Sequence, residues 1–145
     1  MQEFPDLMTA RMCACGNLRR ASRAITQRYD AILAPSGLTT PQFGLLANLA
    51  RTGPITFGNL AQRMGMDRTT LTRDLTPLAR EGYVTIGAGE DRRTRVAQLT
   101  PAGEAALARA LPLWREAQTS IVTAFGAERF TDLITELGEI TALAR

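Results

Sequence analysis

Apolar residues recur every three or four positions over most of this chain, a period that predicts amphipathic helices. Proline and glycine interrupt the pattern at residues 35–37, 52–54 and 65, and glycine ends it again at residue 82. The predicted helices cover residues 7–34, 41–51, 57–64, 68–81, 101–125 and a final stretch from about residue 128. A short extended piece covers residues 55–57, and two strand-like runs cover residues 83–86 and 94–99. This order predicts a mainly helical fold with one small β-hairpin.

The helix predicted over residues 68–81 separates its apolar and polar side chains clearly. Leu71, Leu75 and Leu78 form its buried face, and Asp67 is a suitable N-cap. Pro77 removes a backbone hydrogen bond, so we expect a bend or a loosened turn there. The remaining face presents arginines and threonines, namely Arg68, Thr69, Thr70, Thr72 and Arg73. Such groups grip phosphates and reach base edges in the DNA major groove, which predicts a recognition helix; the alternative is a solvated helix face.

A charged turn follows this helix, between the two strand-like runs. Its arginines are Arg92, Arg93 and Arg95, and an arginine at such a tip can enter a narrow minor groove. Arg93 is the first candidate, and we expect Asp91 to brace the turn by pairing with a nearby arginine. The alternative is an ordinary charged surface turn. A recognition helix followed by a basic hairpin is the outline of a winged helix-turn-helix. Thr56, at the start of its helix, is either a phosphate contact or a simple cap.

The positive charge is concentrated in the part predicted to bind DNA. Residues 51–95 carry eight arginines and five acidic residues, whereas residues 96–145 carry four arginines and six acidic residues. The chain has no lysine. Arginine suits phosphate and guanine contacts, but the complete absence of lysine is better explained by genomic composition.

Several classes of protein are disfavoured by what the sequence lacks. There is no histidine, no glycine-rich phosphate loop and no cluster of carboxylates, so we do not expect an enzyme. Two cysteines are too few for a disulfide framework or a Cys-only zinc site, and no cofactor or metal is predicted. The sequence has no membrane-spanning run and its N-terminus is acidic rather than basic, so we predict a cytoplasmic protein without a membrane partner.

The first helix and the last two carry apolar stripes that a winged module of residues 39–100 cannot cover. The N-terminal stripe is Met8, Met12, Cys15, Leu18, Ser22, Ile25, Tyr29 and Ile32. The C-terminal stripes are Leu107, Leu111, Trp114, Ile121 and Phe125, then Phe130, Leu133, Ile134, Leu137 and Ile140. Exposed stripes of this kind usually meet another chain, and a two-fold dimer suits a palindromic DNA site. We therefore assign residues 1–38 and 101–145 to dimerisation.

Several short segments, taken in order, resemble one family of bacterial transcription regulators. They are residues 38–43 (LTTPQF), 60–61 (LA), 66–73 (MDRTTLTR), 78–84 (LAREGYV), 91–93 (DRR) and 99–103 (LTPAG). Together they make the chain similar to the MarR family over roughly residues 10–125. The resemblance implies a homodimeric winged-helix regulator that binds an operator in double-stranded DNA. We expect it to act as a repressor. The resemblance also implies release by a small-molecule effector or by oxidation. The alternative function is a winged-helix module that makes protein contacts without sequence-specific DNA binding.

The two cysteines are candidate sensing residues. If the segment is helical, Cys13 and Cys15 point about 200° apart, at about 100° per residue, and cannot easily bond to each other or clamp one ion. Cys15 and Tyr29 are placed like the sensing thiol and its tyrosine partner in the organic-hydroperoxide branch of the MarR family. Two alternatives remain open for Cys15: it is a small buried apolar residue, or it binds a soft metal or metalloid.

Overall fold

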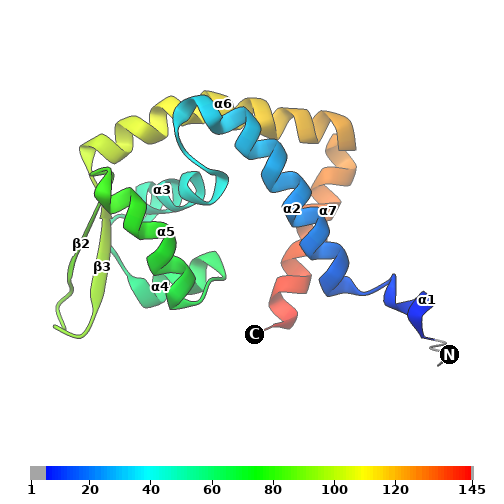
Figure 1. Cartoon of the computed structure of the whole chain (residues 1–145), viewed down its shortest axis with the longest axis horizontal. Helices are drawn as coiled ribbons and strands as arrows, with labels where there is room; N and C mark the ends of the chain where they lie inside the picture. The colour runs from blue at the N-terminus through cyan, green and yellow to red at the C-terminus, as the bar shows by residue number, and fades with distance from the viewer. Residues whose placement is uncertain (1–5, 145) are drawn as a thin grey trace, which may run out of the picture.

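The computed structural model describes residues 6–144, a set of helices around a small sheet. The elements are α1 (Leu7–Ala10), α2 (Ala14–Leu33), a short helical turn η1 (Ala34–Ser36), α3 (Thr40–Thr52), β1 (Ile55–Thr56), α4 (Phe57–Met64), α5 (Arg68–Arg80), β2 (Val84–Ala88), β3 (Arg95–Leu99), α6 (Pro101–Phe125) and α7 (Ala127–Leu143). Figure 1 shows α3, α4, α5 and the hairpin on one side, with α6 running above them toward α2 and α7. The predicted class, mainly helical with a hairpin wing, is confirmed. Residues 1–5, which include part of the acidic N-terminal segment, lie outside the described range.

Side-chain caps fix where three of the central helices begin. The Thr39 hydroxyl accepts the N–H of Gln42 at 3.3 Å, and the Gln42 side chain accepts the N–H of Thr39 at 3.0 Å. This reciprocal capping box satisfies two backbone donors at the start of α3. Asp67 accepts a backbone N–H of α5 at 2.7 Å, and Thr100 caps α6 in the same way. The N-cap predicted at Asp67 is confirmed.

α5 continues through Pro77, where the sequence led us to expect a bend or a loosened turn. The helix runs on to Arg80, and Gly82 follows it with a φ of 76° in the left-handed region. In the turn before the proline, the Thr76 hydroxyl donates to the carbonyl of Thr72 at 2.7 Å. Pro77 therefore does not end the helix, and α5 is one element from its cap to Arg80.

The sheet has three antiparallel strands in the order β1–β3–β2, so the hairpin is tied to the segment that leads into α4. Ile55 of β1 pairs with Ala97 of β3, and Val84 of β2 pairs with Leu99. Strand β2 extends to Ala88, beyond the predicted end at residue 86, so the turn begins later than expected. Because β3 pairs on both sides, the base of the hairpin is fixed relative to α4.

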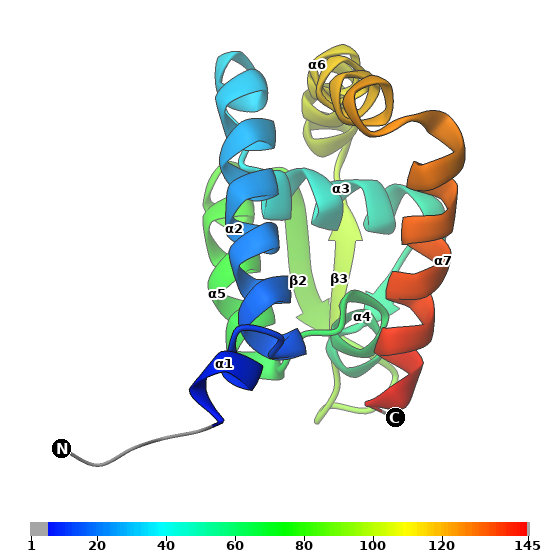
Figure 2. The ribbon, with the colours of Figure 1, turned by 90° about the vertical axis from the view of Figure 1, so that its right-hand side faces the viewer.

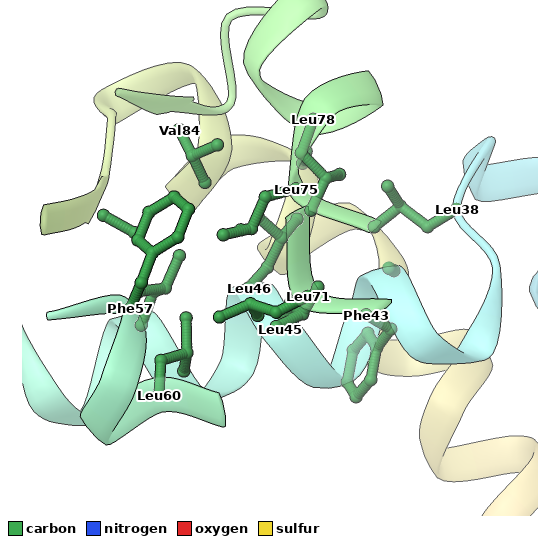
Figure 3. Close-up of a cluster of buried hydrophobic side chains, with 14 of the residues drawn as sticks. Leu38, Phe43, Leu45, Leu46, Phe57, Leu60, Leu71, Leu75, Leu78 and Val84 are labelled. Carbon is green, nitrogen blue, oxygen red and sulfur yellow. The ribbon is translucent and has the colours of Figure 1, made fainter. Parts of the chain in front are cut away.

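A leucine-rich core holds α3, α4, α5 and the sheet together. Its largest fully buried side chains are Leu33, Leu45, Leu46, Leu49, Leu60, Leu71, Leu75 and Leu78. Figure 3 shows Leu71 and Leu75 of α5 beside Leu45 and Leu46 of α3. Burying one such side chain contributes about 1.5–3 kcal/mol, so the leucine face predicted for α5 anchors this helix firmly. Its opposite face is thereby fixed toward solvent.

The deepest face of α6 differs from the one predicted. The expected apolar residues, Leu107, Leu111, Trp114, Ile121 and Phe125, are only half-buried. The buried positions belong to small residues instead, namely Gly103, Ala106, Ala110 and Ala117. A Cβ atom on Gly103 would lie 2.1 Å from the carbonyl oxygen of Tyr83, which leaves no room for a side chain. One chain therefore covers the apolar stripe of α6 only in part, and close approach of α6 to its neighbours selects small side chains at the buried positions.

The first predicted helix is divided in the structure. α1 ends at Ala10, the chain turns, and Cys13 has extended ψ of 117° just before α2 begins. The side-chain amide of Asn17 donates to the carbonyls of Arg11 and Cys13, both at 2.8 Å. A polar side chain that bonds nearby carbonyls offers the backbone an alternative to continuous helix, so the prediction of one helix over residues 7–34 was wrong.

The terminal helices keep much of their apolar surface in solvent. Figure 1 shows α2 and α7 on the side of the molecule away from the wing, and Figure 2 shows them from that side, in front of the sheet. No residue of α7 is buried, and Ile134 and Leu143 are 51% and 85% exposed. Ile25 of α2 is 42% exposed. Among residues 6–144, no helix combines the length and apolar character that a membrane crossing requires.

Candidate nucleic-acid interface

The outward face of α5 carries the predicted reading residues. Arg68, Thr69, Thr72 and Arg73 are exposed, and Thr70 is half-buried at the start of the helix. The backbone N–H of Thr70, followed by its hydroxyl, holds the pKa of Asp67 below the ordinary value of an aspartate. Asp67 is thus ionised at neutral pH and keeps the first turn of α5 ordered. Four of the five predicted side chains are free to contact a ligand laid along this face.

The tip of the hairpin is braced by Asp91, through a different bond from the one expected. Its carboxylate accepts the backbone N–H of Arg93 at 3.0 Å, whereas we expected an ion pair with an arginine side chain. The Asp91 carbonyl accepts the N–H of Thr94 at 2.9 Å, and Gly89 donates its N–H to Thr94 at 2.7 Å. The turn is therefore held by its backbone, and the guanidinium groups of Arg92 and Arg93 stay exposed.

A cavity of about 220 Å³ lies where α4, α5 and the wing meet. It is lined by Phe57, Gly58, Arg68, Thr72, Arg93, Thr94 and Arg95. Three of the predicted arginines, from two separate segments, thus converge on one hollow. A shallower hollow on the outer side of α5 is lined by Arg68, Thr69, Thr72 and Arg73. Arg68 borders both the cavity and the outer hollow, whereas Arg73 borders only the outer hollow.

Two contacts with the first turn of α4 place the cavity arginines. The guanidinium carbon of Arg95 lies 5.8 Å from the ring centre of Phe57, within the range of a cation–π contact. Phe57 is itself buried in the core. An atom Nη2 of Arg68 lies 3.4 Å from the position that a Cβ on Gly58 would occupy. The tip of Arg68 therefore lies near the first turn of α4.

The structure separates two predicted residues from this cavity. Arg92 borders a different hollow on the wing, together with Arg95 and the backbone of β2. Thr56 is half-buried and caps α4, because its hydroxyl accepts the N–H of Asn59 at 3.2 Å. That bond leaves the Thr56 hydroxyl proton available, so a phosphate contact stays a prediction.

Sequence reasoning missed Gly58 and Thr94 as members of the site. A glycine in the first turn of a helix is a poor helix former, which is a signal that some neighbour needs the space. Thr94 lies between two arginines just before β3, in the charged turn that the sequence singles out, and it lines the cavity with both of them. Both signals are visible in the sequence, but their meaning depends on how α4 meets the wing.

The candidate sensing residues lie far from this surface along the chain. Cys13 is the N-cap residue of α2 and Cys15 lies in its first turn, and both thiols are exposed. The geometric objection to contact between them assumed continuous helix, so it no longer holds. Tyr29 is buried, and its hydroxyl donates to the side chain of Gln118 on α6. Burial raises the pKa of Tyr29.

Comparison with known proteins gives a consistent picture. A family model described as "MarR family" matches residues 36–94. The transcriptional regulator PecS of Dickeya dadantii is 30% identical over 142 residues, which cover 95% of this chain and 86% of PecS. The homoprotocatechuate degradative operon repressor of Escherichia coli is 32% identical over 127 residues, which cover 87% and 86% of the two chains.

A solved structure of the transcriptional regulator MosR of M. tuberculosis, in complex with DNA, is also similar to this chain. Sequence identity is 42%, the TM-score is 0.80, and the match covers 92% of this chain and 98% of that one. The first curated relatives, uncharacterized HTH-type regulators of Bacillus, are 36% identical over 95 residues, and the match spans 63% of their length.

Proposed function

The chain belongs to the MarR family of winged helix-turn-helix transcriptional regulators, and on that premise we propose that it is a homodimeric repressor of transcription. In this proposal α5 enters the major groove of a palindromic operator, and the wing reaches the adjacent minor groove. The observation that carries the proposal is the exposed arginine and threonine surface of α5, held rigid by the leucine core beneath it.

The proposal divides the chain into a DNA-binding part and a dimerisation part. Residues 39–100 form the DNA-binding module, and residues 1–38 and 101–145 join two copies. The exposed apolar residues of α2 and α7 support this division, since a single chain leaves them in water. A two-fold dimer places two copies of α5 on one face, which suits two half-sites related by the same symmetry.

The experiment is a binding titration with a labelled duplex from the chain's own promoter region and an unrelated duplex as reference. We expect the affinity to fall steeply between about 50 mM and 200 mM salt, because bound phosphates release counterions. Arg73→Ala should weaken binding to the promoter duplex by roughly tenfold or more, since a base-edge contact contributes about 1–3 kcal/mol. Arg109→Ala, an exposed arginine of α6, is the matched control. Binding that ignores salt and tolerates Arg73→Ala would contradict the proposal.

Release of DNA by thiol oxidation is the second part of the proposal, with binding of a small effector as the other route. An organic hydroperoxide would oxidise a Cys15 thiolate to sulfenic acid, and its O–O bond would break to leave an alcohol. Within one chain both thiols at the start of α2 are exposed, so packing inside the chain does not shield them from an oxidant. The Tyr29 hydroxyl donates a hydrogen bond to Gln118. A sensing role for Tyr29 would require this bond to break so that the hydroxyl could bond the Cys15 thiol instead.

A stoichiometric peroxide titration tests this second part. Wild-type protein should lose promoter binding as Cys15 is oxidised, and a reducing agent should restore it. The Cys15→Ser protein should still bind the promoter duplex after the same treatment. Promoter binding by the Cys13→Ser protein shows whether the neighbouring thiol takes part. If wild-type protein binds normally while mass spectrometry finds Cys15 oxidised, thiol sensing at this position is wrong.

A further inference from the structure

We propose that the cavity between α4, α5 and the wing is a seat for one backbone phosphate of the DNA, with Arg68 as its phosphate ligand and not a base-reading residue. This inference rests on the proposed function and goes further, because it assigns different tasks to two arginines of the same helix. Arg68 and Arg95 would bind the phosphate oxygens, and Thr72 and Thr94 would donate hydroxyl protons to them.

The lining of the cavity has the chemistry of an anion site. Three guanidinium groups and two hydroxyl groups border it, and no carboxylate does among the residues that line it. Converging positive charges repel each other unless an anion lies between them. The planar fork of arginine matches the geometry of phosphate oxygens. A volume of about 220 Å³ holds a phosphate group with some water, given that one water molecule takes about 30 Å³ in the liquid.

The position of Arg68 favours phosphate over bases. Its guanidinium lies against the first turn of α4, within 3.4 Å of the place where a Cβ on Gly58 would be. Arg73 has no such neighbour in the cavity lining and borders the outer hollow with Thr69. Both arginines border the outer hollow, and Arg68 alone of the two also borders the cavity beside the wing.

The arrangement of elements explains why a phosphate should arrive there. A major groove and the adjacent minor groove are separated by one sugar–phosphate backbone. If α5 occupies the first groove and the wing reaches the second, that backbone must pass between them. The cavity lies between these two elements, and Figure 1 shows that the first turn of α5, α4 and the tip of the wing lie toward the same edge of the molecule.

The test compares Arg68→Ala with Arg73→Ala on the promoter duplex and on an unrelated duplex. Arg68→Ala should weaken binding to both duplexes by the same factor, roughly tenfold or more, so that their ratio is unchanged. Its slope of log affinity against log salt should be shallower by about 0.9, the value for one phosphate contact. Arg73→Ala should instead reduce the ratio between the two duplexes. Arg109→Ala should leave slope and ratio as in wild type, and matching urea midpoints show that each variant is folded.

Two further arms decide how a different result is understood. If Arg68→Ala lowers only the promoter affinity and keeps the wild-type slope, Arg68 reads bases and the inference is overturned. Inorganic phosphate, titrated at constant ionic strength, tests the other source of the same ligand. If it stabilises wild type but not Arg68→Ala against urea, while the DNA slope of the variant is normal, the cavity takes free phosphate and the inference is also overturned. A wild-type protein that binds no duplex would overturn the proposed function as well.

Discussion

Apolar side chains are buried to different extents in the winged part of the molecule, α3 to β3, and in the terminal helices α2 and α7. In the winged part, leucines of α3, α4 and α5 are fully buried within one chain. In α7 no residue is buried, and large apolar side chains such as Ile134 lie half in water. The difference teaches that a single chain is enough to build the surface that we propose faces DNA, but leaves the apolar face of the terminal helices uncovered. A rigid reading surface can be built locally, whereas the spacing of two such surfaces requires a second copy.

The largest expected effect comes from opening a cavity in the winged core. Leu46→Ala removes a fully buried side chain of α3 and should lower the free energy of unfolding by about 2–5 kcal/mol. Urea denaturation at fixed protein concentration measures it. Ile134→Ala, on α7, is the matched change at a half-exposed position and should cost far less at concentrations where the chain is monomeric. Equal losses of unfolding free energy at the two positions would contradict the difference in burial between the two regions.

The second largest effect is expected on self-association through the terminal helices. Ile134→Asp places a charge on the exposed apolar face of α7 and should weaken self-association by about 100-fold or more, because burial of an isoleucine contributes about 1.5–3 kcal/mol on each side of a two-fold interface. Sedimentation velocity over a range of concentrations measures it. Thr135→Asp, at the next exposed position of α7, is the control for added charge. If neither change moves the monomer–dimer equilibrium, α7 does not join the two copies.

The smallest effect is a pH dependence at the cap of α5. The folded-state pKa of Asp67 is lowered by the Thr70 N–H and hydroxyl, so its contribution to stability is complete above the unfolded pKa of about 3.9. That contribution is lost as the pH falls through the lower, folded-state pKa. Urea midpoints measured from neutral to acid pH should therefore bring wild type and Asp67→Asn together at the acid end. A constant difference down to that pH would show that the carboxylate charge is irrelevant to the cap.

Sequence reasoning succeeded where structure depends on neighbours in the chain. The leucine face of α5 follows from its period, and the cap at Asp67 follows from residue type beside a helical pattern. The approximate positions of β2 and β3 follow from alternation and from the glycines around them.

Errors arose where a distant element or a local competing bond decides the outcome. The break before α2 is bridged by Asn17, whose side-chain amide donates to the carbonyl of Arg11, a carbonyl that a continuous helix would pair with a backbone N–H. The small-residue face of α6 depends on how closely α6 approaches the carbonyl of Tyr83. The cavity beside Arg68 depends on the meeting of α4 with the wing, so Gly58 carried no functional meaning before the fold was known.

The central claim is that two rigid DNA-binding surfaces, one α5 from each chain, are held together by the terminal helices of a dimer. Hydroxyl-radical footprinting of wild-type protein on its own promoter region tests it most directly. The account predicts two protected patches with a two-fold relation, centred about one helical turn of roughly 10 base pairs apart or a multiple of it. Each patch should weaken in Arg73→Ala. A single protected patch with no symmetric partner, or a uniform protection that ignores sequence, would contradict the account.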